Sequence, residues 1–305
     1  MKIWFDRNKT CFETFITEKF LLMPFFEKRI IKSNKDFENA DNWIDSCMNI
    51  ISEVPQDKAN IFVYHDKLNH GIGETIQLAT KFNKQIIAFY NDDNSNPTSL
   101  PPRVDLYRTS LYKSKQKINE YPFPAWSEDF GTAERLHIRP KSDKPIVGFC
   151  GAITHPIRRM AISLIEKNTN INTNFLIRGN FWGGSIHNQQ IREEYICNIN
   201  SSDMVLCCRG AGNFSYRLYE AMSLGRVPII VDTDIVLPCD DVIDWKSISV
   251  WVDNVNLINH SINDFWQKIT DIDYRKLQST IRDTYDKYIC PAGFTSYLSN
   301  KYQVL

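Results

Sequence analysis

LCCRGAGNFSYRLYEAMSLGRVPII, residues 206–230, is the stretch from which the fold is most directly inferred. An apolar run ends at Arg209, a glycine-rich turn follows, and residues 213–224 have the apolar spacing of a helix. A second apolar run begins at Val227. A strand, a tight turn, a helix and a strand in this order predict one βαβ unit of a parallel sheet.

The same alternation extends in both directions along the chain. It predicts two α/β halves joined near residues 140–145, and ligands of such folds bind at the C-terminal ends of the strands. Residues 91–104 are rich in Asn, Asp, Ser and Pro and predict a loop. We expect strands at 2–5, 61–64, 85–90, 145–150, 174–178, 203–208 and 227–231, and helices at 41–52, 73–82, 157–167, 189–200 and 213–224.

The length of 305 residues, about twice that of a usual domain, also favours two domains. We expect an N-terminal domain over residues 1–142 and a C-terminal domain over residues 143–290. The tail, residues 291–305, is expected to pack back on the N-terminal domain.

Charge and composition exclude several classes of protein. The chain has 36 Lys and Arg against 36 Asp and Glu, so it lacks the positive surplus of a nucleic-acid or membrane-coating protein. No run approaches the ~18 apolar residues of a membrane span, and the charged N-terminus does not read as a secretory signal. The 8 cysteines have no metal-like spacing and predict reduced, mostly buried thiols. We therefore expect a cytoplasmic protein without nucleic-acid partners, which meets any anionic ligand with a few local arginines.

The turn after the strand at 203–208 has the chemistry of an anion site. Gly210 and Gly212 allow a tight turn, and Asn213 is placed to cap the following helix. A glycine-rich loop beside a helix N-terminus presents free N–H groups and the positive end of the helix dipole. The side chains available there as phosphate ligands are Arg209, Ser215 and Arg217.

Glu220 is expected about two turns into this helix, off its apolar stripe. A carboxylate at that place suits paired hydroxyls such as those of a ribose. The same residues also fit an ordinary strand–turn–helix, in which the glycines serve geometry alone and Arg217 and Glu220 form an i,i+3 ion pair. The local chemistry leaves both interpretations open.

The order of these residues resembles the C-terminal signature of the exostosin-like glycosyltransferases. That signature contains an Arg-Gly turn, Ser-x-Arg-x-x-Glu-Ala, a Pro-containing strand, then Leu-Pro and a buried Trp. The resemblance covers roughly residues 145–290, whereas residues 1–140 match loosely. The chain looks like a soluble bacterial or viral member, because it lacks the membrane anchor of eukaryotic relatives. The matching elements are Arg209-Gly210, Ser215 to Ala221, Gly225 to Ile230, Leu237-Pro238 and Asp244-Trp245, with residues 147–151 and 155–159 upstream.

This resemblance implies a GT-B fold, an α/β architecture in which two Rossmann-like domains face each other across a cleft. It implies an inverting hexosyl- or pentosyltransferase that moves a sugar from a UDP-sugar to a hydroxyl of a glycan or polysaccharide acceptor. No obligatory metal or other cofactor is implied. The donor would lie on the C-terminal domain and the acceptor on the N-terminal one. Carried over to matching positions, Arg158, Arg209, Ser215 and Arg217 would hold the diphosphate at the Gly210–Gly212 turn, and Glu220 would hold the ribose.

An inverting transfer needs a general base for the acceptor hydroxyl. His65 and Asp66 directly follow the strand at 61–64 and are the best-placed candidates, although an Asp there also suits a turn cap. Glu74, at a helix entry, is the next candidate, and its alternative role is to satisfy the helix dipole. Asp129 ranks third.

Asp232-Thr-Asp234 matches the Asp-x-Asp signature of metal-dependent glycosyltransferases of another fold. Here it follows a strand of a second Rossmann-like domain, so we interpret it as a coincidence and expect no metal site. Trp245 is expected in the core.

Two rival functions come from other classes. A non-catalytic nucleotide-sugar-binding module would bind UDP-sugars without transfer. A Rossmann-type oxidoreductase would have Gly-x-Gly-x-x-Gly after its first strand, and the turn at 210–215 lacks the third glycine.

Overall fold

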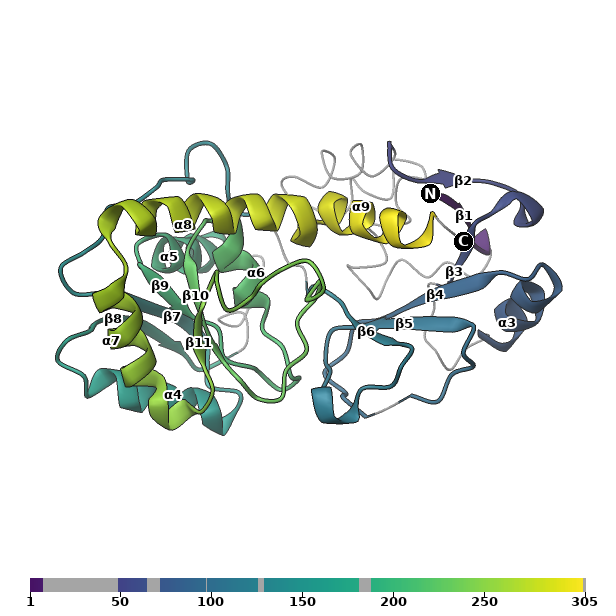
Figure 1. Ribbon diagram of the computed structural model, residues 1–305. Coiled ribbons are helices and arrows are strands. Elements are labelled where there is room, and N and C mark those ends of the chain that lie inside the picture. The colour runs from purple at the N-terminus through teal and green to yellow at the C-terminus, as the bar shows by residue number, and fades with distance from the viewer. Residues whose placement is uncertain (8–48, 65–71, 97, 126–128, 181–187, 304–305) are drawn as a thin grey trace. The chain divides into compact units, whose positions relative to one another are not determined.

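The computed structural model of the protein describes residues 1–7, 49–64, 72–96, 98–125, 129–180 and 188–303 (Figure 1). The chain divides into two compact units. Unit 1 comprises residues 1–126, 236–239 and 287–305, and unit 2 comprises residues 127–235 and 240–286. Residues 127–142, which we expected in the N-terminal domain, are thus part of unit 2.

Unit 1 is built on a sheet whose described strands pair in parallel, in the order β2-β1-β3-β4-β5-β6. Chain order reverses between β1 and β3, which makes this the switch point of the sheet. The elements are β1 (Lys2–Trp4), β2 (Ser52–Glu53), η3 (Gln56–Lys58), β3 (Ile61–Tyr64), α3 (Ile72–Lys81), β4 (Gln85–Tyr90), β5 (Val104–Arg108), η4 (Lys113–Lys115), β6 (Glu120–Pro122) and α9 (Pro291–Tyr302).

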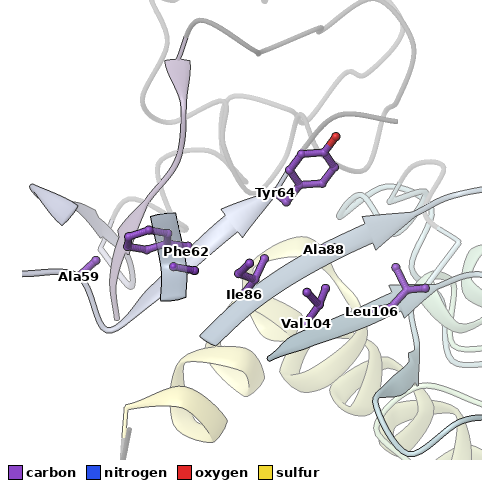
Figure 2. Packing of buried hydrophobic residues seen from close by; sticks show 8 residues of the cluster. Ala59, Phe62, Tyr64, Ile86, Ala88, Val104 and Leu106 are labelled. Atoms are coloured by element: carbon purple, nitrogen blue, oxygen red, sulfur yellow. The ribbon is translucent and has the colours of Figure 1, made fainter. Parts of the chain in front are cut away.

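One face of this sheet carries an apolar cluster that includes Ala79 of α3 (Figure 2). Phe62, Ile86 and Leu106 come from three neighbouring strands and have 0% exposure. Val63, Ile87 and Tyr107, which follow them in sequence, are also buried, because a parallel sheet is covered on both faces. On α9, Phe294 packs edge-on against Tyr107, with ring centroids 6.0 Å apart.

Strand β5 was not expected, because Asp105 and Arg108 make its sequence look polar. Both side chains are buried and both have partners. The Tyr302 hydroxyl donates to Asp105 Oδ2 at 2.6 Å, and Arg108 Nη1 donates to Glu120 Oε1 at 2.8 Å. Arg108 also donates to the Asn96 carbonyl at 2.8 Å, so the ion pair holds the loop before β5 in place.

Unit 2 has a second parallel sheet of order β11-β10-β9-β7-β8. Its switch point lies between β7 and β9, where chain order reverses. The strands are β7 (Ile146–Ala152), β8 (Asn172–Arg178), β9 (Met204–Leu206), β10 (Val227–Val231) and β11 (Val250–Val252).

Helices cover both faces of this sheet (Figure 1). Helices α4 and α7 contact each other on one face, and α5, α6 and α8 lie on the other. Their bounds are α4 (Pro156–Glu166), α5 (Gln189–Asn200), α6 (Tyr216–Ser223), η6 (Val255–Leu257), α7 (Ile258–Lys268) and α8 (Asp271–Thr284), and α8 is followed by the π-helical segment η7 (Tyr285–Ile289).

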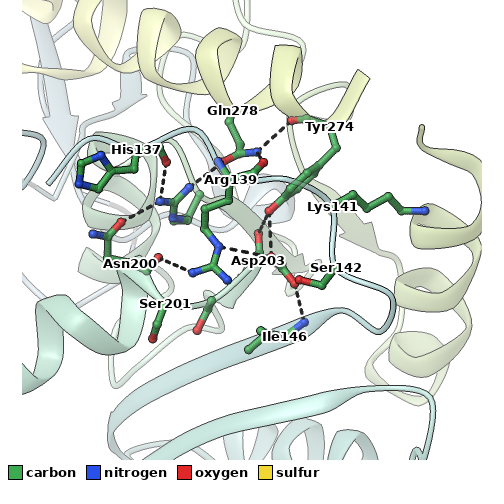
Figure 3. Close-up of polar contacts among 12 residues, drawn as sticks. His137, Arg139, Lys141, Ser142, Ile146, Asn200, Ser201, Asp203, Tyr274 and Gln278 are labelled. Carbon is green, nitrogen blue, oxygen red and sulfur yellow. Dashed lines mark hydrogen bonds and ion pairs between the residues drawn. The ribbon is translucent and has the colours of Figure 1, made fainter. Parts of the chain in front are cut away.

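A buried network of hydrogen bonds joins the segment before β7 to the rest of unit 2 (Figure 3). Arg226 is fully buried and donates to the His137 carbonyl at 2.8 Å, to Gln278 Oε1 at 2.7 Å and to Asn200 Oδ1 at 2.7 Å. Asp203 accepts from the Ile146 N–H at 2.9 Å. These bonds explain why residues before β7 belong to this unit.

Several expected elements are confirmed at their boundaries, namely the strands at 61–64, 85–90 and 227–231 and the helix at 189–200. The end of the helix expected over 41–52 is wrong, because Ser52–Glu53 form strand β2; residues 41–48 lie outside the described residues. The core position expected for Trp245 is confirmed at 5% exposure. Across the described ranges, no helix combines the length and the apolar character needed to cross a membrane.

Candidate functional site

The C-terminal ends of β7 and β9 lie on either side of the switch point of unit 2, where α/β sheets bind ligands. Each of these strands leads into a helix that carries an arginine in its first turn. Arg158 is the third residue of α4, whose N-terminus is capped by His155. Arg217 is the second residue of α6, whose N-cap is Ser215.

Arg158 joins the two strand ends. Its side chain is buried and donates to the Ala152 carbonyl at 2.9 Å, the Cys208 carbonyl at 3.2 Å and the Arg209 carbonyl at 2.8 Å. Burial, and after it the charge of Arg217, lowers the pKa of Arg158 to about 10. Arg158 therefore holds the two strand ends together and places a positive charge beside them.

Arg217 uses only some of its hydrogen-bond donor atoms. Its Nη2 donates to the Cys150 carbonyl at 2.6 Å, and its guanidinium carbon lies 4.2 Å from the centroid of the Phe149 ring. The side chain is buried, yet Nε and Nη1 have no hydrogen-bond partner. The ion pair with Glu220, which the local pattern also allowed, does not form between these two described residues.

Ser215 adds a third unpartnered group. Its Oγ is buried and makes no hydrogen bond, and it does not cap α6. Leaving a buried polar group unpaired costs about 1–3 kcal/mol, so native proteins rarely do so. Three such groups at the start of one helix, beside its dipole, indicate a place for a ligand rich in acceptor oxygens.

The turn between β9 and α6 differs in detail from expectation. Neither Gly210 nor Gly212 has a positive φ, so a left-handed conformation does not explain them. Gly210 instead makes room, because a Cβ there would lie 3.1 Å from Arg158 Nη2. Arg209 folds over its own loop and donates to the Ala211 carbonyl at 2.8 Å.

Asn213 does not cap α6, and the helix begins at Tyr216 instead of at residue 213. The Asn213 side chain is fully buried and joins a neighbouring loop. Its Nδ2 donates to the Thr233 carbonyl at 3.2 Å, and its Oδ1 accepts from the Thr233 hydroxyl at 2.7 Å. These bonds join Asn213 to the loop that follows β10.

Glu220, the fifth residue of α6, is 2% exposed. Its Oε2 accepts a hydrogen bond from the hydroxyl of Tyr195 on α5. Burial and the Glu220 charge raise the pKa of Tyr195 well above its usual range, so this hydroxyl stays protonated as a donor. Tyr195 could not be identified from the sequence, because it lies on a helix without any motif.

The thiols near the site are inert. Burial raises the pKa of Cys207, and it raises the pKa of Cys208 to about 12. All six cysteines of the described ranges are free and five of them are buried, which agrees with the expectation for that part of the chain.

The residues predicted as candidates for the general base differ in their place in the fold and in their partners. His65 and Asp66 follow the last residue of β3 in sequence, and they lie outside the described residues. Glu74 is exposed in the first turn of α3. Asp129 has both carboxylate oxygens bound by Arg282, at 2.6 and 2.9 Å.

The acidic pair Asp232 and Asp234 forms a local turn, in which Asp232 Oδ1 accepts from the Asp234 N–H at 2.9 Å. Within the described ranges, no group of three or more His, Cys, Asp or Glu side chains is placed to hold a metal ion.

The family is established by comparison with known proteins. The chain belongs to the exostosin GT47 domain family, whose profile matches residues 60–263. It is 42% identical over 59 residues to a probable glucuronosyltransferase of Oryza sativa subsp. japonica, which is 19% of this chain and 14% of that protein. It is 48% identical over 48 residues to a probable beta-1,4-xylosyltransferase of Arabidopsis thaliana, which is 16% of this chain and 12% of that protein. The chain thus matches only a small part of these relatives' length.

Among solved structures, the apo form of the lipopolysaccharide outer core galactosyltransferase WaaB is similar over 99% of this chain and 100% of its own. The TM-score is 0.52 at 14% sequence identity, so the likeness concerns the fold alone. The α/β fold class expected from the sequence, of the GT-B type with two parallel-sheet domains, is confirmed.

Proposed function

We propose that the protein is a glycosyltransferase that moves a sugar from a UDP-sugar to a hydroxyl of a glycan acceptor, with inversion at the anomeric carbon. Family membership supports the general activity. The names of the relatives, glucuronosyltransferase and xylosyltransferase, make UDP-glucuronic acid and UDP-xylose the first donors to try.

The observation that carries this proposal is the set of unpartnered donors at the start of α6. Arg217 Nε, Arg217 Nη1 and Ser215 Oγ are buried donors without acceptors, and a diphosphate supplies acceptor oxygens with the matching charge. The residues around these strand ends and the start of α6 include three arginines (Arg158, Arg209 and Arg217) and one glutamate (Glu220). The net positive charge of this set suits such an anion.

The chemistry follows from this arrangement. The acceptor oxygen attacks the anomeric carbon while the bond from that carbon to the β-phosphate oxygen breaks. The bonding electrons leave with UDP, and the acceptor proton passes to a base. The arginines and the N-terminal end of α6 stabilise the charge that develops on the leaving diphosphate. Asp66 or His65 is the proposed base, with Glu74 the next candidate.

A thermal-shift panel tests the proposal, because a ligand that binds the folded state raises its melting temperature. UDP, UDP-xylose, UDP-glucuronic acid, UDP-galactose and, as a control nucleotide sugar, GDP-mannose are compared. We expect UDP and one UDP-sugar to raise the melting temperature, and that donor to give product with an inverted anomeric centre by NMR. A panel without any shift would contradict the donor site, whereas binding without transfer or hydrolysis would favour a non-catalytic binding module.

A further inference from the structure

Tyr195 connects helix α5 to helix α6, where the UDP-sugar is proposed to bind. It lies on α5, is half-buried, and donates its hydroxyl to Oε2 of the buried Glu220 on α6. The two residues are 25 positions apart in sequence. A carboxylate that is held by a phenolic hydroxyl has a fixed plane, because rotation about its last bond would break a charge-assisted hydrogen bond.

The Tyr195 ring also borders Arg217. The guanidinium carbon of Arg217 lies 5.9 Å from the Tyr195 centroid and 4.2 Å from the centroid of Phe149. Arginine faces favour such aromatic neighbours. Tyr195 therefore contacts both Glu220, to which the family resemblance assigns the ribose, and Arg217, a proposed diphosphate-binding residue.

The Tyr195 ring packs against Phe130. The ring of Phe130 meets it edge-on, with centroids 6.1 Å apart. The Phe130 N–H donates to Ser223 Oγ at 3.1 Å, which ties this support to α6. A side chain that is braced in this way and bonded to a buried carboxylate has the properties of a positioning residue.

We propose that Tyr195 is a positioning residue of the donor site: it orients the Glu220 carboxylate toward the ribose hydroxyls and thereby makes the site select ribonucleoside over deoxyribonucleoside diphosphates. This inference rests on the proposed function, because it requires UDP to bind at α6. It assigns a role in nucleotide selectivity to a residue that does not itself contact the ribose.

The test is the ratio of dissociation constants for 2′-deoxy-UDP and UDP, measured by calorimetry on the full chain. We expect the wild-type protein to prefer UDP by on the order of tenfold to a hundredfold, as the loss of one hydrogen bond to a charged group implies. Tyr195→Phe should lower this ratio toward that of Glu220→Gln. Adding Tyr195→Phe to Glu220→Gln should lower this ratio no further, because Glu220→Gln has already removed the carboxylate through which Tyr195 acts.

Tyr274→Phe is the matched control (Figure 3). The Tyr274 hydroxyl also contacts a buried carboxylate of unit 2, at 3.4 Å from Asp203 Oδ1, but Asp203 precedes β9 at the opposite end of the sheet. This variant should keep the wild-type ratio even if its melting temperature falls. If Tyr195→Phe does not fold, Phe130→Leu removes the brace of Tyr195 and should lower the ratio in the same direction.

The outcomes separate the two proposals. A folded Tyr195→Phe protein with the wild-type ratio would overturn the role of Tyr195 while leaving the donor site intact. A wild-type protein that binds neither nucleotide would overturn the proposed function, and the role of Tyr195 with it.

Discussion

A Cβ atom on Gly151 would lie 2.6 Å from Nη2 of Arg217. Gly151 is near the end of β7 and has a φ of +148°, a backbone conformation that residues other than glycine rarely adopt. The strand thus comes close to the arginine because it has no side chain at this position. The neighbouring Cys150 carbonyl accepts the hydrogen bond of the same Nη2, at 2.6 Å.

Gly151→Ala should therefore displace Arg217 and strain the backbone. We expect a loss of stability of ~1–3 kcal/mol, the usual cost of an unfavourable backbone conformation, together with weaker UDP binding. Urea unfolding and calorimetry measure the two effects. Gly179→Ala is the control, since a Cβ at Gly179 would meet nothing within 4 Å. Equal behaviour of the two variants would show that the close approach at Gly151 has no consequence.

His155 should make stability depend on pH. Burial, and after it the charges of Arg209 and Arg158, lowers the pKa of His155 from its ordinary value of 6.5. The unfolded chain then takes up a proton at higher pH than the folded protein, so the free energy of unfolding falls as the pH drops below 6.5. Protonation also removes the cap, because His155 Nδ1 accepts from the Ile157 N–H at 3.2 Å.

Urea unfolding between about pH 7.5 and pH 5 tests this dependence. His155→Asn keeps a capping acceptor without titrating, so it should lose less stability than the wild type over this range. The same loss in both proteins would assign the pH dependence to other groups.

Asp66→Asn should retain UDP affinity and lose turnover, because the amide cannot accept the acceptor proton. General-base catalysis contributes on the order of 10²–10⁴-fold, and a loss of that size is expected in single-turnover transfer assays. Glu74→Gln and Asp129→Asn are measured beside it. A fully active Asp66→Asn protein would remove Asp66 as the base, and a large loss in one of the other two would identify the replacement.

EDTA should leave transfer largely unchanged. Asp232→Asn should also be active, since an amide oxygen can still accept the hydrogen bond from the Asp234 N–H. Both are measured as initial rates with the donor that the thermal-shift panel identifies. A strong loss of rate in both experiments would contradict this interpretation and indicate that Asp232 and Asp234 form a metal–nucleotide site.

Much of the fold follows from the sequence because several of its strands are short apolar runs, such as residues 227–231, that are buried on both faces. Strand β5 could not be predicted in this way. Asp105 and Arg108 look incompatible with a buried strand until Tyr302 and Glu120, which are distant in sequence, are seen to pair with them.

The candidate site, too, could be predicted only as far as its residues are close together in sequence. The motif around Arg217 identifies residues that could bind a phosphate, but it does not show which of their atoms lack partners. The Cys150 carbonyl, the Phe149 ring and Tyr195 come from other strands and helices, and the fold alone brings them to Arg217. The prediction that Asn213 caps α6 was wrong because its side chain binds Thr233, in a loop some 20 residues away in sequence.

The central claim is that the unpartnered donors of Arg217 bind the diphosphate of a UDP-sugar. The most direct test is calorimetry of UDP binding to the wild type, to Arg217→Ala and to Arg275→Ala, which removes an exposed arginine paired with Asp271 elsewhere in unit 2. Hydrogen bonds to charged groups contribute about 1.5–3 kcal/mol each, so Arg217→Ala should weaken UDP binding by at least about tenfold while Arg275→Ala leaves it unchanged. UDP affinity that is the same in all three proteins would contradict the claim.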